Sequence, residues 1–325
     1  MRAIRFHEYG EPEVLRLELV ETPTPGPQQV LIRVRAAGVN YADVMRRRNM
    51  YVQHTPLPFI PGSEVAGEVV AVGPGVRSFK EGDRVVTLLG PKCSGYAEYT
   101  IGYEPMLIPI PEGLDMVQAA ALPLQGLTAY HILKTSAKVL PGETVLVHAA
   151  AGGVGTLAVQ LAKIFGAKVI ATASTEEKLA LARSLGADHT VNYTSPDWDK
   201  QVLELTNGAG VDVILEMVGG EVFRKNLGIL AEFGRMVVFG AASKERATLE
   251  PFRLMNKCQS VIGFLLTPVV RRPELYWPSL NELLQLVKDG RLKLQIGGTY
   301  PLEQAALVHR LLEGRQTTGK LVLVP

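Results

Sequence analysis

The sequence predicts an α/β protein of two domains, in which an N-terminal domain of short strands accompanies a doubly wound parallel sheet. Three observations support this fold class. The chain has 325 residues, which is more than a single hydrophobic core usually serves. Its N-terminal third reads as strands separated by Pro and Gly turns. From residue 144 onward, apolar strands alternate with helical patterns.

The N-terminal third contains short runs in which apolar and polar residues alternate, as half-buried strands require. Segments rich in Pro and Gly, such as 22–27 and 73–75, separate these runs as turns. We expect strands over 3–6, 15–20, 30–37, 67–72, 84–87 and 97–101, and helices over 116–122 and 127–138.

Residues 144–178 form the most informative stretch of the chain. The apolar run 145–147 predicts a short buried strand, and the loop 150–155 follows it directly. Apolar residues then recur at helical spacing up to Phe165, and a second strand covers 168–172. A strand, a glycine loop, a helix and a strand within about thirty residues form the context that a dinucleotide-binding fingerprint requires.

The composition of this loop agrees with a bound pyrophosphate, because the first turn of a helix offers unpaired amides and a positive dipole end. Gly152 leaves no Cβ in the way of the phosphates, and Gly155 allows the helix and strand to pack closely. Ala150 replaces the first glycine of the G-x-G-x-x-G pattern, so an ordinary strand–turn–helix is the alternative. The two flanking strands favour the dinucleotide site.

The end of the second strand indicates which dinucleotide binds. An NAD site usually places Asp or Glu there to hold the ribose 2′-hydroxyl, whereas this strand runs into Ser174 without an acid at its tip. Ser174 and Lys178 can supply a hydrogen bond and a charge to a 2′-phosphate, which favours NADP. Alternatively, Ser174 and Glu177 form a capping box and Lys178 is a solvated helix lysine, and both interpretations can hold together.

The alternation of strands and helices continues to the C-terminus. A helix over 177–185 and strands over 190–192, 211–216, 235–240 and 260–264 complete a six-stranded doubly wound unit. We then expect a helix over 278–288, a strand over 292–300, a helix over 302–312 and a closing strand near 319–323 that rejoins the first domain.

Composition limits the function classes. A net charge of +2 argues against a protein that binds polyanions, and we interpret Arg46, Arg47 and Arg48 as a solvated face. Two cysteines make neither a disulfide framework nor a metal cluster. Because we find no signal-peptide core and no apolar run of bilayer length, we expect a soluble cytoplasmic protein.

Several separate motifs resemble one family along almost the whole chain. They are Ala37 to Asp43 (AGVNYAD), Pro61 to Gly67 (PGSEVAG), Gly82 to Val85 (GDRV), Ala151 to Gly155 (AGGVG), Phe239-Gly240 and Thr318 to Lys320 (TGK). This set resembles the zinc-independent quinone oxidoreductase (zeta-crystallin-like) branch of the medium-chain dehydrogenase/reductase family. The resemblance implies a GroES-like β domain (1–124 and 267–325) interrupted by a Rossmann NADP-binding domain (125–266), with the active site between them. It also implies NADPH as cofactor and a homodimer or dimer of dimers.

The chain differs from the zinc alcohol dehydrogenases, which this fold also resembles. Asn40 stands where they carry a ligating Cys, and Ser63 replaces the His of their Gly-His-Glu motif. Only Glu64 remains of a set that needs three ligands, and Cys93 is a bystander in a loop that lacks the structural-zinc cysteines. We therefore expect no metal, and alcohol oxidation loses the Lewis acid that lowers the alcohol pKa.

The resemblance also implies the site residues. Asn40, Asp43 and Tyr51 are the catalytic candidates, with Tyr41 and Gln125 as weaker ones. Alternatively, Asn40 caps a turn, Asp43 caps or charges the first turn of a helix, and Tyr51 simply packs. We interpret His148 as a core residue. The cofactor candidates are Asn40, Thr128, Ala151, Gly152, Gly153, Val154, Gly155, Ser174, Lys178, Tyr193, Phe239, Gly240 and Lys320.

The leading functional hypothesis is an NADPH-dependent, zinc-free reductase that transfers a hydride to quinones. An enone or enoyl reductase that uses the same residues is the alternative within the enzymes. A protein of another class, which binds NADPH or nucleic acid with little turnover, is the second alternative. The near-neutral charge and the lack of an aromatic and basic stripe count against nucleic acid.

Overall fold

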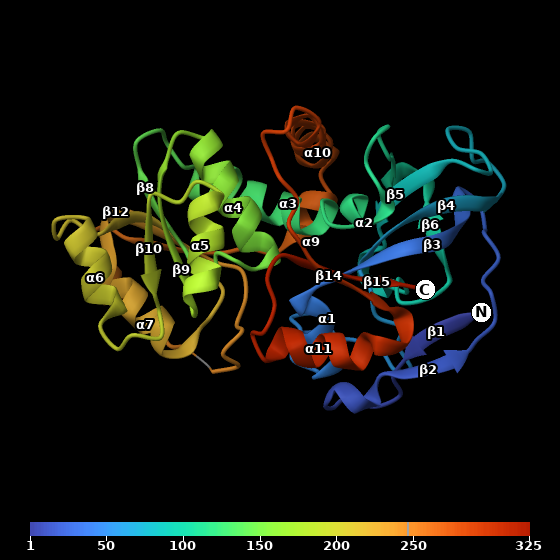
Figure 1. The fold of residues 1–325 in the computed structure, drawn as a ribbon, viewed down its shortest axis with the longest axis horizontal. Helices are drawn as coiled ribbons and strands as arrows, with labels where there is room; N and C mark the ends of the chain where they lie inside the picture. The colour runs from blue at the N-terminus through green and yellow to red at the C-terminus, as the bar shows by residue number, and fades with distance from the viewer. Residues whose placement is uncertain (246) are drawn as a thin grey trace. The chain divides into compact units, whose positions relative to one another are not determined.

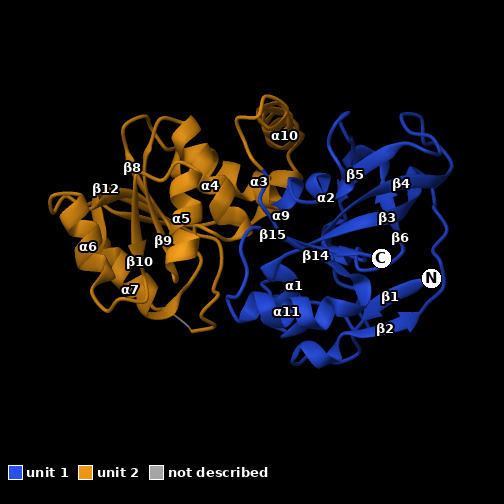
Figure 2. Ribbon diagram, viewed as in Figure 1, with its two compact units in different colours: residues 1–124, 294–325 blue, residues 125–293 orange. Residues whose placement is uncertain are grey.

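The structure is a computed structural model that describes residues 1–245 and 247–325. The chain forms two compact units, residues 1–124 with 294–325 (unit 1) and residues 125–293 (unit 2), as Figure 2 shows. The sequence-based division also begins its second domain at residue 125, but it assigns 267–293 to the β domain. In the structure these residues belong to unit 2, because the long helix α10 (Pro273–Lys288) hydrogen-bonds to α3 (Pro123–His131), most of which lies in unit 2.

Unit 1 is built on a seven-stranded sheet with the order β14-β15-β3-β4-β5-β7, to which β6 adds by pairing with β3 (Figure 1). β1 and β2 form a separate antiparallel pair. The strands are β1 (Arg2–Arg5), β2 (Arg16–Leu19), β3 (Gln29–Val39), β4 (Glu64–Val72), β5 (Arg84–Leu88), β6 (Tyr99–Tyr103), β7 (Leu107–Pro109), β14 (Ile296–Pro301) and β15 (Lys320–Val324). The helices are α1 (Tyr41–Arg47), α2 (Met116–Ala119) and α11 (Ala305–Glu313), with short 3₁₀ turns η1 (Pro12–Val14), η2 (Gly90–Lys92), η3 (Glu104–Met106) and η5 (Leu302–Gln304).

The long strand β3 organises unit 1. Val30 and Ile32 alternate along it and pack in one apolar cluster with Val69 and Val85, as the period of two of a half-buried strand requires. β15 pairs antiparallel with β3, so that Leu321 lies opposite Val39. The predicted closing strand therefore does return to the first unit, and it brings the C-terminal segment beside the end of β3.

Unit 2 is a six-stranded parallel sheet with the order β10-β9-β8-β11-β12-β13. This order reverses between β8 and β11, which confirms the doubly wound fold. The strands are β8 (Thr144–Val147), β9 (Lys168–Ala173), β10 (His189–Asn192), β11 (Val211–Glu216), β12 (Leu230–Val238) and β13 (Ser260–Gly263). The helices besides α3 and α10 are α4 (Gly153–Ile164), α5 (Glu176–Ser184), α6 (Trp198–Leu205), α7 (Gly220–Ile229), α8 (Phe252–Met255) and α9 (Leu266–Val270).

The central strands of unit 2 are apolar on both faces, because helices cover both. Leu146 of β8 and Ile214 of β11 are fully buried and share a core with Val202 of α6 and Leu227 of α7. In Figure 1, α4 and α5 lie on one side of the strands of this sheet, and α6 and α7 lie on the other side. Among the described residues, no helix is long and apolar enough to cross a membrane.

Two helices of unit 2 differ from the predicted bounds. The helix expected over 127–138 begins at Pro123 as α3 and continues from Ile132 to Ala137 as a π-helix, η4. The helix expected to begin at Pro278 begins at Pro273, so Pro278 lies inside α10. Both prolines fit the first turn of a helix, and periodicity alone does not decide which of them begins it.

His131 links α3 to α10 inside unit 2. Its Nε2 lies 2.9 Å from the Ser279 hydroxyl oxygen, and its Nδ1 lies 2.7 Å from the Thr135 hydroxyl oxygen. The Ser279 hydroxyl donates to backbone carbonyls, so it accepts from the imidazole, which assigns the neutral Nε2–H tautomer. Burial lowers the pKa of His131 to about 4.

We expect acidification to weaken this link. The unfolded chain takes up the His131 proton near its ordinary pKa of 6.5, whereas the folded chain takes it up only near 4. The contribution of neutral His131 to the free energy of unfolding is therefore complete above pH 6.5, and it falls by about 1.4 kcal/mol per pH unit between pH 6.5 and pH 4. Urea unfolding at pH 7 and pH 5 measures it: the stability difference between the wild type and His131→Gln should shrink at pH 5. An equal difference at both pH values would contradict the assignment.

Candidate active site

The predicted phosphate loop lies where the doubly wound fold places nucleotides, at the carboxyl end of β8. The Gly152 amide donates to the Ala149 carbonyl at 2.8 Å, and α4 begins at the next residue. Ala149 has a φ of +47°, so the chain turns sharply between the strand and the helix. The first amides of α4 precede the helical hydrogen bonds, as do the amides that bind anions at helix N-termini.

The three glycines of this loop are required for different reasons. A Cβ on Gly155 would lie 2.2 Å from the Ala149 carbonyl oxygen, and one on Gly153 would lie 2.0 Å from the Gln125 side-chain oxygen. Gly155 is therefore needed by the fold itself, because its neighbour is backbone, whereas Gly153 meets the end of a flexible side chain. A Cβ on Gly152 would meet only the Ala149 carbonyl oxygen, at 3.2 Å. That contact is tight, but no other atom is within 4 Å of the added Cβ, so the loop is less crowded at Gly152 than at Gly153 or Gly155 and fits the close approach of a dinucleotide pyrophosphate.

The remaining cofactor candidates of unit 2 lie at neighbouring strand ends of the same sheet edge. Ser174 follows β9 and Tyr193 follows β10, and the Tyr193 amide donates to the carbonyl of Ala173 at 3.2 Å. Phe239 follows β12, and its amide donates to the carbonyl of Glu216 at the end of β11. Further candidates in this unit are Ala151, Val154, Lys178, Gly240 and, on α3, Gln125 and Thr128.

One alternative considered for Ser174 is wrong. The N-cap residue of α5 is Thr175, whose hydroxyl accepts from the Lys178 amide at 3.4 Å, so Ser174 and Glu177 do not form the capping box. The cap lies one residue later because Ser174 and Thr175 form the bend between β9 and α5. Ser174 and Lys178 are both half-buried, at the end of a strand that carries no acidic residue.

A buried polar chain beneath this edge was not predicted. His148 is buried, as expected for a core residue, and its two ring nitrogens lie 2.8 Å from the Thr172 hydroxyl and from the Asn226 side-chain oxygen. Asn226 in turn donates to Glu216. The other Glu216 oxygen accepts the amides of residues 218 and 219, which fixes the loop after β11. An acid at the end of an apolar strand is the only sequence signal for this network.

In unit 1, Asn40, Glu64 and Lys320 meet in a buried cluster at the end of β3. The Lys320 ammonium donates to the Asn40 side-chain oxygen at 2.8 Å and to Glu64. The side-chain amide of Asn40 donates to the same Glu64 oxygen at 3.0 Å, and the main-chain amide of Leu124 donates to the other Glu64 oxygen at 2.8 Å. Gly38 makes room for the cluster, because a Cβ there would lie 2.7 Å from both Glu64 and Lys320.

Asp43 holds a second buried cluster next to the first. Its carboxylate accepts hydrogen bonds from the main-chain amide of Asn40 at 3.0 Å, from the Tyr96 hydroxyl at 3.1 Å and from the main-chain amide of Gly62 at 3.3 Å. Burial raises the pKa of Asp43, although these donors and the Lys320 ammonium act in the opposite direction. Asp43 thus both caps α1, as the alternative proposed, and anchors Asn40. Tyr96 is a partner that the sequence did not indicate.

The donor set at this place does not fit a catalytic zinc. Asn40 and Ser63 are not zinc ligands, and Glu64 is already hydrogen-bonded to the Lys320 ammonium and to two amide groups. A divalent cation would have to displace or repel that ammonium. Burial raises the pKa of the nearby Cys93 thiol to about 11, which disfavours a metal-binding thiolate. The described residues also contain no group of three or more His, Cys, Asp or Glu that could hold a metal ion.

The arginine triplet is not a solvated face, contrary to our expectation. Arg46 is 4% exposed and Arg47 is fully buried, because both lie on the inner side of α1. The Arg46 guanidinium lies against the ring of Tyr51, with its central carbon 4.1 Å from the ring centroid. Tyr51 is half-buried, so it packs on Arg46 and keeps part of its surface exposed.

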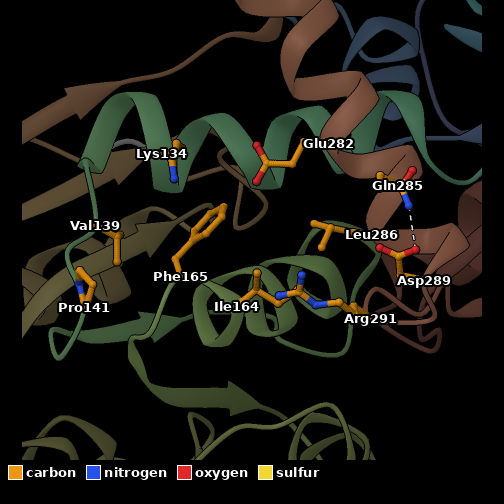
Figure 3. A pocket seen from close by; sticks show the side chains of 10 residues that line it. All are labelled: Lys134, Val139, Pro141, Ile164, Phe165, Glu282, Gln285, Leu286, Asp289 and Arg291. Atoms are coloured by element: carbon orange, nitrogen blue, oxygen red, sulfur yellow. Dashed lines mark hydrogen bonds between the residues drawn. The ribbon is translucent and has the colours of Figure 1, made fainter.

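Unit 2 also contains a pocket of about 500 Å³ that is not part of the predicted site. Its lining includes Ile164 and Phe165 at the carboxyl end of α4, together with Lys134 and Glu282 (Figure 3). The phosphate loop lies at the opposite end of α4. None of the residues that line this pocket is a cofactor or catalytic candidate, so its chemistry is separate from that of the site.

Comparison with known proteins agrees with both units. Two family models match: "Alcohol dehydrogenase GroES-like domain" over residues 26–112 and "Zinc-binding dehydrogenase" over residues 153–287. The chain is 38% identical to a quinone oxidoreductase of Pseudomonas aeruginosa, covering 100% of this chain and 99% of that protein. It is also 38% identical to a 2-haloacrylate reductase of a Burkholderia species, over 98% of each.

A solved structure extends this comparison. The quinone oxidoreductase of Escherichia coli in complex with NADPH is 33% identical to this chain, with a TM-score of 0.94 and 100% coverage of both chains. Likeness of this extent and identity goes beyond a shared fold. The chain belongs to the quinone oxidoreductase branch of the medium-chain dehydrogenase/reductase family.

Proposed function

We propose that this protein is an NADPH-dependent oxidoreductase that transfers a hydride to quinones without a metal. The loop from β8 to α4, with Gly152 as the N-cap and only one contact to a Cβ there, is the observation that carries the proposal, because a dinucleotide pyrophosphate is the ligand that such a loop serves. The NADPH complex of the E. coli relative supports NADPH as the dinucleotide. In the balanced reaction, NADPH, a quinone and a proton give NADP⁺ and a hydroquinone.

Bound NADPH supplies the hydride from its nicotinamide ring, and the protein binds and orients the reactants. The first amides of α4 bind the pyrophosphate, and Ser174 with Lys178 binds the 2′-phosphate. In unit 1, Lys320 and Glu64 fix the side chain of Asn40, and Asp43 fixes its backbone. We assign Asn40 and Asp43 to positioning and Tyr51 to contact with the acceptor.

Acceptors that need little proton assistance suit a site in which the Lys320 ammonium is already paired with Glu64. Quinones are such acceptors, and so are α,β-unsaturated carbonyl compounds. A second candidate function, reduction of an enone or enoyl compound, is favoured by the full-length likeness to a 2-haloacrylate reductase. The same residues serve both reactions, so the choice depends on the acceptor.

A panel of acceptors tests the proposal. NADPH and NADH oxidation is measured with 1,4-benzoquinone, 9,10-phenanthrenequinone, an acyclic enone and an enoyl thioester. Turnover of the quinones with NADPH supports the proposal. Turnover only of the enone or the thioester assigns the second function, and tight NADPH binding without any turnover would contradict both.

The preference for NADPH provides a separate prediction. Ser174→Ala combined with Lys178→Ala should weaken NADPH binding by about 1–3 kcal/mol, the usual contribution of charge-assisted hydrogen bonds, and leave NADH nearly unchanged. Fluorescence titration of both cofactors measures this. Equal losses for NADPH and NADH would show that the two residues do not contact the 2′-phosphate.

We also propose how the chain is organised in the cell. Unit 2 is the cofactor-binding domain and unit 1 supplies the acceptor side. The protein forms a homodimer or dimer of dimers in the cytoplasm, through the sheet edge of unit 2. β13 is an edge strand of the six-stranded sheet, and its Val261 and Ile262 are only half-buried. A second copy of the chain that pairs with this edge would bury both residues. Sedimentation at several protein concentrations tests the oligomer, and cell fractionation tests the location.

A further inference from the structure

The three consecutive arginines at the C-terminal end of α1, of which Arg48 is the C-cap, are unequally paired. Arg47 donates to Glu313 and to the Gly10 carbonyl, and Arg48 donates to Glu313 at 2.6 Å. Arg46 is buried to a similar degree as Arg47, yet among residues 1–245 and 247–325 no carboxylate lies within 4 Å of its guanidinium. One buried arginine of this triplet therefore lacks a counter-ion.

The contacts of Arg46 hold its position and leave its Nε without a partner. The rings of Tyr51 and Phe59 lie 4.1 and 5.7 Å from its central carbon. Its Nη1 donates to the Thr55 hydroxyl at 3.4 Å, and a hydrogen bond from its guanidinium lowers the pKa of Tyr51 against the larger effect of burial. Its Nε is buried without a partner, as is that of Arg47, but Arg47 has Glu313 as a counter-ion. The aromatic rings thus stabilise the Arg46 guanidinium by cation–π contact, while its Nε stays unsatisfied.

An unpaired buried guanidinium is costly, because it has lost water without gaining an anion. An apolar residue would fill the space beside Tyr51 and Phe59 at lower cost. The unpaired Nε and the Nη2 beside it form a planar fork, which matches a carboxylate in bidentate geometry. These features are those of a site that a ligand completes.

Arg46 lies on the acceptor side of unit 1. It follows Asp43 by three residues on α1, so both project from one face of the helix. Its charge acts on the Tyr51 hydroxyl and on the Cys93 thiol, lowering the pKa of each against the larger effect of burial. Cys93 contacts Ser63 at 3.5 Å, and Ser63 contacts Asp43. Arg46 and Tyr51 therefore belong to the same cluster as the proposed positioning residues.

We propose that Arg46 binds an anionic group of the acceptor, and that the protein accordingly prefers quinones or unsaturated carbonyl compounds that carry a carboxylate. This inference rests on the proposed function and specifies its substrate class. Tyr51 covers the guanidinium and contacts the acceptor, and the carboxylate accepts from Nε and from the Nη2 on the same side of the guanidinium. Arg46 is thus a specificity-determining residue.

A matched pair of acceptors tests the inference. 3-Benzoylacrylate carries a carboxylate next to an enone, and its ethyl ester is the neutral equivalent. The ratio of kcat/KM for the acid to kcat/KM for the ester should fall by about 10- to 100-fold in Arg46→Met and Arg46→Gln, as expected for loss of a charge-assisted bidentate contact. Arg46→Lys keeps the positive charge, so it should retain part of the preference for the acid over the ester. Arg48→Met, which removes the paired arginine at the C-cap of the same helix, should leave the ratio unchanged.

Direct binding separates this inference from the proposed function. 3-Benzoylpropionate has the same carboxylate but no double bond to reduce, so calorimetry measures its affinity without turnover. Its Kd should rise by about 10- to 100-fold in Arg46→Gln. Equal affinity in the wild type and in this variant would overturn the role of Arg46, whatever the activity. Absence of turnover with 9,10-phenanthrenequinone would instead contradict the proposed function and leave the anion site standing.

Thermal unfolding distinguishes recognition from structural support. Arg46→Met removes a charge without a counter-ion, so its Tm should equal or exceed that of the wild type. Arg47→Met is the matched control, and its Tm should fall because the Gly10 carbonyl and Glu313 lose a buried donor. A fall in Tm for Arg46→Met as large as that for Arg47→Met would mean that Arg46 is structural and would overturn the inference.

Discussion

Replacing Gly152 with valine should abolish NADPH binding while leaving the protein folded. Gly152 has φ −78° and ψ 172°, an extended conformation that valine adopts readily, and a Cβ there meets only one atom, at 3.2 Å. The added methyl groups would occupy the space that the pyrophosphate needs. Fluorescence titration should show the Kd for NADPH raised at least about 100-fold, which corresponds to about 2.7 kcal/mol.

Gly155→Ala is the matched control for this prediction. Its new Cβ would lie 2.2 Å from the Ala149 carbonyl oxygen, so this variant should lose thermal stability in addition to NADPH binding. Circular dichroism melts distinguish the two variants. A Gly152→Val protein that binds NADPH with wild-type Kd would show that the loop does not hold the pyrophosphate.

Replacing Lys320 with methionine should strongly destabilise the protein. The Lys320 ammonium is 1% exposed and is the charged partner of Glu64, which is fully buried. Removal of one member of such a pair leaves an uncompensated buried charge, which costs about 3–5 kcal/mol of unfolding free energy. Urea unfolding with wild-type and variant proteins measures the loss.

Two further variants define the origin of this effect. Lys80→Met removes a lysine whose side chain is 84% exposed and pairs with Asp83, and it should cost less than about 1 kcal/mol. Lys320→Met combined with Glu64→Gln removes both charges and should recover at least half of the loss. No recovery in the double variant would show that the packing of Lys320, rather than its charge, stabilises the cluster.

The sequence was sufficient for most of the fold. Strand, glycine loop and helix around residues 144–165 obey local rules of periodicity and turn chemistry, and the structure places them as predicted. Return of the C-terminal strand to the first unit also followed from its strand-like pattern, whereas its pairing with β3 was not predicted. Helix starts were less predictable: Pro273 and Pro278 both suit a first turn, and only packing of α10 on α3 decides between them.

The sequence predicted which residues form the candidate site better than it predicted their hydrogen-bond and ion-pair partners. The motifs indicated Asn40, Glu64 and Lys320, but they lie far apart in the sequence, and only folding brings the ammonium to the carboxylate. The arginine triplet shows the limit most clearly. Three adjacent charges suggest solvent exposure, whereas α1 directs Arg46 and Arg47 inward, where Glu313 pairs with only one of them.

The most direct test of the central claim is an anaerobic reaction of the protein with NADPH and 9,10-phenanthrenequinone. NADPH labelled with deuterium at either face of nicotinamide C4 is used in single turnovers, and the hydroquinone is quantified. We expect one hydroquinone for each NADPH consumed, and slower decay with only one of the two labels, because the protein presents one face for hydride transfer. No consumption of NADPH, or consumption without an equal amount of hydroquinone, would contradict the account.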